Sequence, residues 1–177
     1  MKKCLLPLAA LGVALAFPLA ASDTEHGHHG NADGEMSSRS EAGPRLSPAL
    51  AAQLLPGYLA LQEALADDNL DGAHEAVAGM MEPTGHSGSV HDLLHEMSGA
   101  ETLEIIRRPL FDELSAAMVA AAEEDPSVFP EGLVVMQCPM VYGSTGAEWI
   151  QEGETVDNPY FGAKMLRCGG PVMKIRE

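Results

Sequence analysis

Apolar residues recur at spacings of three and four along most of residues 47–126, and this period constrains the fold more than any other feature of the sequence. Ser47 followed by Pro48 is typical of a helix start, because serine caps free amides and proline fits the first helical position. The apolar positions of this first helix are Leu50, Leu54, Leu55, Tyr58, Leu61 and Leu65. We expect the helix to end at Asp67, with Pro56 either kinking it or marking a later start.

Three further helices are predicted in the same half of the chain. The first runs over Leu70–Met81, and a loop with proline and glycine at 82–89 separates it from a short helix over Val90–Met97. The last runs from Leu103 to about residue 125, with Pro109 inside it as a site for a bend. The predicted buried positions are Ala73, Ala76, Val77 and Met80 in the first of these helices, and Leu103, Ile106, Leu110, Leu114, Met118 and Ala121 in the last.

The sequence changes character after Pro130. Leu133–Met136 and Glu148–Gln151 are short runs typical of strands, and glycines punctuate the remainder. Aromatic residues make up only 5% of the chain, which favours helices over sheets. The predicted fold class is therefore mainly α: a small antiparallel helical bundle over residues 47–126, packed against an irregular C-terminal lobe over 127–177 with one or two short strands.

The first 22 residues have the features of a cleaved secretory signal peptide. A lysine pair supplies the positive start, the apolar stretch Leu5–Leu19 follows, and small residues allow cleavage after Ala21 or Ser22. The apolar stretch is shorter than the roughly 20 residues that a membrane span needs. We expect an exported, periplasmic protein that is not embedded in the membrane and has one domain.

Residues 23–46 form a predicted disordered leader, because they contain almost nothing to bury. His26, His28 and His29 lie in it and offer a weak, mobile site for Cu(II), Ni(II) or Zn(II), or else belong to a spacer without a specific role. Loss of the two signal lysines would change the formal net charge from −16 to −18. Such acidity argues against a nucleic-acid partner, because phosphate binding needs a basic surface.

Two cysteines remain after removal of the signal peptide, and each has a methionine within three residues. Cys138 is followed by Met140, and Met165 precedes Cys168. If these segments meet, two thiols and two thioethers form a soft ligand set suited to Cu(I). The alternative is a disulfide, which oxidising compartments favour and which would stabilise the domain by roughly 3–4 kcal/mol in the chain-entropy model. The residues leave both open.

A second, speculative metal pair is His91 with His95, which share a helix face at a spacing of four. The same spacing arises by chance in solvent-facing histidines, and the string His91-Asp92-Leu93-Leu94-His95 departs from the His-Glu-x-x-His pattern of metalloproteases. The chain also has no Cys-x-x-Cys, no Gly-x-Ser-x-Gly and no phosphate loop. We therefore expect a protein that is not an enzyme.

The C-terminal strings Cys138-Pro139-Met140, Trp149-Ile150-Gln151, Asn158-Pro159-Tyr160-Phe161-Gly162 and Met165-Leu166-Arg167-Cys168-Gly169 resemble the DUF3347 family. This family occurs in exported bacterial proteins, alone or fused to periplasmic adaptors of RND-type heavy-metal efflux pumps of the CusB type. The resemblance covers roughly residues 48–170, with weak matches in the helices. It implies a helical periplasmic domain linked to copper or silver handling. The residues themselves predict that Asn158-Pro159 starts a turn and that Gly162 takes a positive φ.

Two functions are expected from these features. The first is a periplasmic metal-binding protein that captures Cu(I), or Ag(I), for sequestration or for delivery to an efflux pump. The ligands would be Cys138 and Cys168, assisted by Met140 and Met165. The alternative is a disulfide-stapled helical module that docks on an efflux adaptor or another envelope protein without binding metal specifically.

Overall fold

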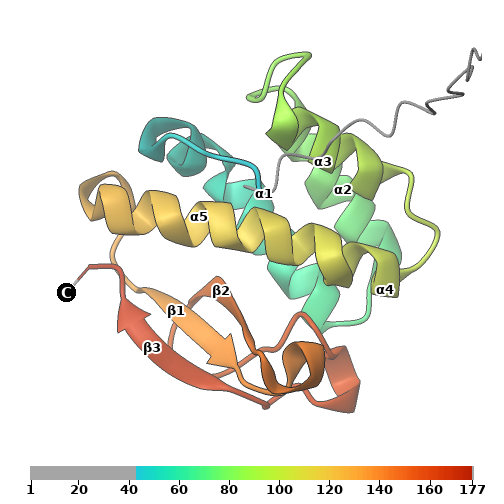
Figure 1. The fold of residues 1–177 in the computed structure, drawn as a ribbon, viewed down its shortest axis with the longest axis vertical. Helices are drawn as coiled ribbons and strands as arrows, with labels where there is room; N and C mark the ends of the chain where they lie inside the picture. Colours follow the sequence, from blue (N-terminus) through green and yellow to red (C-terminus); the bar gives the residue numbers. More distant parts are fainter. Residues whose placement is uncertain (1–42, 177) are drawn as a thin grey trace, which may run out of the picture. The chain divides into compact units, whose positions relative to one another are not determined.

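The computed structural model describes residues 43–176, in which helices lie on one side of a small antiparallel sheet (Figure 1). The predicted signal peptide, most of the predicted leader, and His26, His28 and His29 lie outside the described residues. Within the range predicted as leader, Leu46 is only 7% exposed and belongs to the core. Among residues 43–176, no helix combines the length and the apolar character that a membrane span requires.

The first two helices match the sequence prediction closely. α1 spans Pro48–Ala66, and α2 spans Leu70–Met81. Pro56 lies inside α1 without delaying its start, and Ser47 Oγ caps the helix by accepting from Leu50 N at 3.3 Å. The predicted buried face of α2, which is Ala73, Ala76, Val77 and Met80, is buried. The two helices are in close contact at Gly57, where an added Cβ would collide with the side chain of Met80 on α2.

α3 spans Ser89–Ser98, as predicted to within a residue at each end, but the predicted long fourth helix is broken. Its parts are α4 at Leu103–Ile105, an irregular turn at Ile106–Phe111, and α5 at Asp112–Glu124. Proline lacks an amide hydrogen and disfavours the helical region for the residue before it, and Arg108 accordingly has φ −147° and ψ 116°. The apolar period survives the break, since Ile106, Leu110, Leu114, Met118 and Ala121 are all buried.

The prediction of a mainly α fold with an irregular C-terminal lobe is wrong, because the C-terminal part forms a three-stranded sheet. β1 spans Leu133–Cys138, β2 spans Ala147–Glu152, and β3 spans Gly170–Lys174. The strand order is β2-β1-β3, antiparallel throughout. The fold is therefore a mixed α/β domain. β3 escaped prediction because it begins Gly-Pro and all five of its residues are at least partly exposed, so it lacks an apolar alternation.

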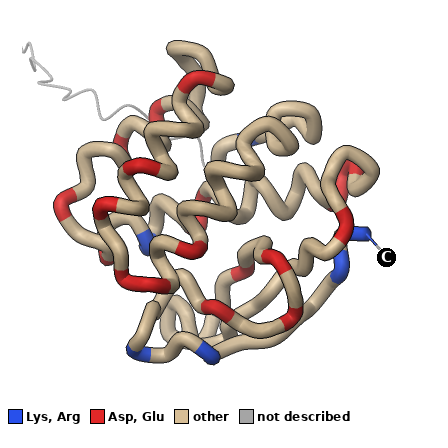
Figure 2. The backbone as a smooth tube through the Cα atoms, turned by 180° about the vertical axis from the view of Figure 1, so that it is seen from behind, with Lys and Arg blue, Asp and Glu red and all other residues tan. Residues whose placement is uncertain are grey.

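Helices and sheet share one core, so the C-terminal part is not a separate lobe. α5 packs across β2 (Figure 1). The side chain of Tyr58 on α1 reaches the same strand. Its hydroxyl accepts from Ile150 N at 3.0 Å and shares a hydrogen bond of 2.7 Å with Ser115 Oγ on α5. Acidic residues are spread over the helices and the loops, whereas basic residues occupy few positions (Figure 2).

Candidate thiol site

Cys138 and Cys168 lie in contact, with their Sγ atoms 3.1 Å apart and both as free thiols. The sheet explains the meeting: β1 and β3 are neighbours, and their register pairs Gln137 with Gly170. Cys138 is the next residue along β1, and Cys168 lies two residues before β3 begins to pair. The condition that the two cysteine segments meet is therefore fulfilled for the two thiols. We call these two residues the thiol pair.

The two thiols differ in exposure. Cys138 has no exposed surface, whereas Cys168 is partly exposed. A hydrogen bond with the Cys138 sulfur, together with burial, raises the pKa of the Cys168 thiol. The raised pKa favours the protonated form of Cys168, and a metal ion that binds there would have to displace its proton.

Cys168 is positioned by the segment 158–168, which folds back on itself through Asn158. The buried Asn158 side chain donates from Nδ2 to the Cys168 carbonyl at 2.7 Å. Its Oδ1 accepts from Tyr160 N at 2.8 Å and Phe161 N at 3.3 Å, and its backbone amide donates to Leu166 O at 2.9 Å. We call this segment the Asn158 loop. Its hydrogen bonds fix the backbone that carries the second thiol.

Two glycines allow the Asn158 loop to approach the rest of the domain closely. Gly162 has φ +55°, as predicted, and a Cβ there would collide with the carboxylate of Asp68. Gly169 has φ +128°, and a Cβ there would lie 2.7 Å from Gln137 O and 3.2 Å from the Trp149 ring. A side chain at Gly162 would push the loop away from Asp68 and Arg107, and one at Gly169 would push the chain away from the sheet.

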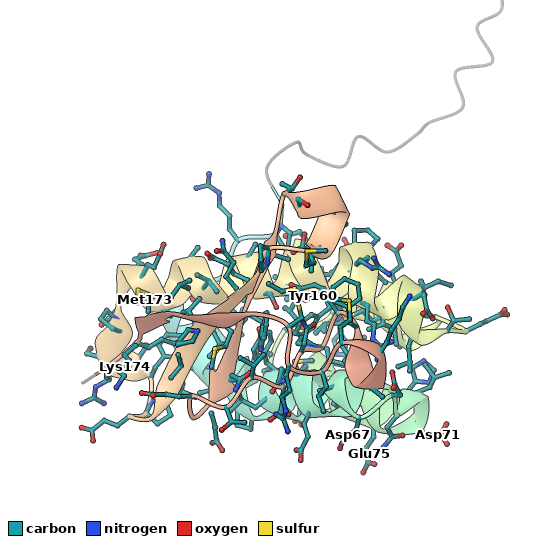
Figure 3. All side chains as sticks on the ribbon, turned by 90° about the horizontal axis from the view of Figure 1, so that it is seen from below. Asp67, Asp71, Glu75, Tyr160, Met173 and Lys174 are labelled. Carbon is teal, nitrogen blue, oxygen red and sulfur yellow. The ribbon has the colours of Figure 1, made fainter. Side chains whose placement is uncertain are left out.

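A chain of aromatic rings packs beneath the site. Trp149 lies edge-on to Tyr160 with centroids 5.9 Å apart, and Tyr160 lies edge-on to Phe111 at 5.6 Å. Tyr160 sits between the helices and the C-terminal segment (Figure 3), where its hydroxyl donates to Glu148 O at 2.9 Å and to Asp112 Oδ1 at 3.2 Å. Burial raises the pKa of Asp112. These aromatic residues anchor the loop through packing and hydrogen bonds.

The two predicted thioether ligands are placed differently from the thiols. Met140 is 52% exposed, two residues beyond the end of β1, so the structure does not bury it with the pair. Met165 is partly buried in the Asn158 loop, where its carbonyl accepts from Cys168 N at 2.9 Å. The arrangement therefore unites the two sulfurs of the cysteines and leaves the Met140 thioether at the surface.

His91 and His95 both lie on α3, but the partners of His91 come from the loop before that helix. Its Nδ1 lies 3.3 Å from Thr84 Oγ1, and its ring is edge-on to His86 with centroids 6.3 Å apart. His95 is exposed. Within residues 43–176, no group of three or more His, Cys, Asp or Glu side chains is arranged to hold a metal ion.

An ion pair between the buried Arg107 and the exposed Asp68, near the Asn158 loop, was not predicted. Arg107 is 5% exposed and donates through Nη2 to Asp68 Oδ1 and to the Leu65 carbonyl. Asp68 Oδ2 accepts from Ala163 N at 3.0 Å, so one carboxylate joins α1, the broken helix and the loop. The hydrogen bond from Arg107, followed by that from Ala163, lowers the pKa of Asp68. The sequence does not indicate that Arg107 is buried, because the residue lies beside Ile106 in a predicted helix, where a charged side chain is expected to face solvent.

Two surface grooves lie away from the thiol pair. One, of about 540 Å³, runs between α1 and the segment after β2, and its polar lining includes Gln62, Glu63, Asp67 and Asp157. The other, of about 490 Å³, lies between residues 43–46 and α5. Neither cysteine lines either groove. Asp67, which lines the first groove, lies near Asp71 and Glu75 at the edge of the domain, and the three side chains point away from its body (Figure 3).

Comparisons with protein-family models, with curated proteins and with solved structures found no match to this chain. The resemblance to the DUF3347 family therefore remains a prediction from the strings that carry it.

Proposed function

We propose that this domain binds a soft monovalent metal ion, Cu(I) or Ag(I), through Cys138 and Cys168. The observation that carries the proposal is the contact of the two thiols, whose Sγ atoms are 3.1 Å apart although 30 positions separate them in sequence. Sulfur ligands select soft ions of this kind over Mg²⁺ or Ca²⁺. In the periplasm, the compartment predicted from residues 1–22, such a protein would sequester the ion or pass it to an efflux adaptor.

The residues present fit the ion in two respects. Both donors are thiols already in contact, so binding needs no rearrangement of the sheet. Each thiol loses its proton when it binds metal, and the monovalent cation then offsets one of the two negative charges of the neighbouring thiolates. Cys168 is partly exposed and offers a route for entry, while Met140 at the surface is available as a further soft ligand.

The alternative function, a disulfide-stapled interaction module, is favoured by the same contact together with the full burial of Cys138. A staple there would tie the end of β1 to the residues that precede β3. In that case the thiol pair acts only on stability, and the partner surface lies elsewhere on the domain.

An anaerobic titration with Cu(I) against a competing chelator tests the first function. The mature chain, fully reduced, is compared with Cys138→Ser, Cys168→Ser and a deletion of residues 23–42 that removes His26, His28 and His29. Either cysteine change should weaken Cu(I) binding by at least about 100-fold, whereas the deletion should leave it nearly unchanged.

Ala163→Ser is the matched control, because it places a serine at an exposed position of the same loop. Met140→Leu and Met165→Leu measure the thioether contribution separately. Equal affinity in all variants would refute metal binding by the thiol pair. A Cys138–Cys168 bridge that persists in the presence of Cu(I) and mild reductant would favour the interaction module.

A further inference from the structure

We propose that the thiol pair reacts with small-molecule disulfides in a fixed order, with Cys168 as the entry thiol and Cys138 as the resolving thiol. The domain would thus act as a dithiol that reduces a disulfide such as oxidised glutathione and becomes internally bridged. This reaction uses the sulfurs of the proposed metal site but requires no metal, so it stands or falls separately.

The order follows from exposure. A sulfur that attacks an external disulfide must touch it, and only Cys168 of the pair has exposed surface. Cys138 is the last residue of β1, opposite Ala147 of β2. With no exposed surface, Cys138 meets an external reagent only when the sheet end opens.

The second step follows from proximity. Cys138 Sγ lies 3.1 Å from Cys168 Sγ, and a disulfide bond is about 2.05 Å long. The main chain at Cys138 is held by its pairing with Ala147 of β2, and the main chain at Cys168 is held by the hydrogen bond from Asn158 Nδ2 to Cys168 O. Rotation of the two side chains is therefore sufficient to close the bond.

The chemistry balances without any further reactant. The Cys168 sulfur, after losing its proton, attacks one sulfur of glutathione disulfide, a mixed disulfide forms, and one glutathione leaves as a thiolate. The Cys138 sulfur, after losing its proton, attacks Cys168 Sγ and expels the second glutathione thiolate. Two electrons pass from the cysteine sulfurs to glutathione disulfide, and the two protons released by the cysteines end on the two glutathione thiols.

Intact-mass spectrometry of the reduced mature chain with oxidised glutathione, in the presence of a metal chelator, tests this order. Wild type should lose two hydrogens and retain no adduct. Cys138→Ser should accumulate one glutathione, because the resolving thiol is missing. Cys168→Ser should react at least about 100-fold more slowly than Cys138→Ser in native buffer, and at a similar rate in denaturant, because Cys138 reacts only through opening of the fold.

A measurement on unsubstituted protein guards against variants that fail to fold. Brief exposure of reduced wild type to iodoacetamide, followed by peptide mapping, should place the first label on Cys168. Equal labelling of both cysteines, equally fast glutathione addition to the two serine variants, or a stable glutathione adduct on wild type would overturn the proposal. Because the reaction is followed without metal, a failed Cu(I) titration leaves these results unaffected.

Discussion

At the scale of single residues, Asp68 is the charge on which the Asn158 loop depends. Its carboxylate is the anionic partner of the buried Arg107 and also accepts from Ala163 N. The pKa of Asp68 is lowered in the folded protein, so its ionised form stabilises the fold above the unfolded-state pKa. That stability is lost as the pH falls through the lowered pKa.

We therefore predict that Asp68→Asn lowers the free energy of unfolding by about 1–2 kcal/mol at pH 7, a value reduced for the partial exposure of the carboxylate. The difference from wild type should be complete at neutral pH and shrink progressively below about pH 4, where the unfolded-state carboxylate is protonated first and the folded-state carboxylate only at lower pH. Urea denaturation at several pH values measures it. Asp67→Asn, at the exposed neighbouring position, should change stability little, and an equal loss in both variants would contradict this role.

Comparison of Gly162 with Gly153 separates two costs of replacing a glycine: the backbone strain of a positive φ and the steric clash of an added Cβ. Gly162 has φ +55° and no room for a Cβ, whereas Gly153 has φ +70° and open space around it. Gly153→Ala should cost about 1 kcal/mol from backbone strain alone, and Gly162→Ala at least about 2–3 kcal/mol because of the added clash with Asp68. Chemical denaturation measures the free energy of unfolding of both variants. Similar losses would show that the Asn158 loop shifts to accommodate a Cβ at position 162.

The sequence predicted some of these residue roles and missed others. The positive φ of Gly162 was expected from the turn string, and the meeting of the cysteines was expected from their paired contexts. Burial of Arg107 was not expected, because no periodic pattern distinguishes a cation that pairs internally from one that faces solvent. The exposure of Met140, away from the thiols, was also not expected. It depends on the direction that the backbone takes after Pro139, and the spacing of neighbouring residues in the sequence does not specify that direction.

At the scale of elements, the helices were predictable and the third strand was not. α1, α2 and α3 agree with their apolar periods to within about two residues, because each buries one continuous face. The break at Pro109 was indicated only as a bend, since the local chain conformation depends on packing around Arg108. β3 is defined by its pairing with β1, a long-range contact that its own Gly-Pro-rich sequence does not encode.

The Asn158 loop gives a prediction at this scale. Asn158→Ala removes one donor and one acceptor that together hold Cys168 O, Tyr160 N and Phe161 N. We expect a loss of about 2–4 kcal/mol in unfolding free energy, because buried main-chain groups lose their partners. Alkylation of Cys138 in native buffer should also accelerate, since the loop no longer covers it.

Asn158→Asp retains the acceptor oxygen and lacks the donor, so it isolates the hydrogen bond to Cys168. Asn69→Ala is the comparison for a lost asparagine elsewhere: Asn69 caps α2 through Gly72 N, and its loss should cost about 1 kcal/mol without changing thiol reactivity. Equal alkylation rates in all three variants would mean that the loop does not shield the pair.

At the scale of the whole molecule, a polar contact inside the core joins the two layers. β2 is an edge strand, and Ile150 N, which β1 does not bond, is satisfied by the hydroxyl of Tyr58 from α1. The same hydroxyl is hydrogen-bonded to Ser115 on α5, and burial raises the pKa of Tyr58 well above its usual range. The helices therefore share an apolar core with the sheet and also supply the hydrogen-bond partner of a main-chain amide on its edge strand.

This coupling predicts that the described domain unfolds in one transition. Trp149, the single tryptophan of the chain, reports on the sheet, and the circular dichroism signal at about 222 nm reports on the helices. The two curves should coincide in urea, because neither layer retains a closed core without the other. Tyr58→Phe should shift both midpoints together, with a loss of about 1–3 kcal/mol from the unpaired Ile150 amide. A tryptophan transition that precedes the loss of helix, in wild type or in Tyr58→Phe, would show instead that the sheet is a separate unit docked on a helical bundle.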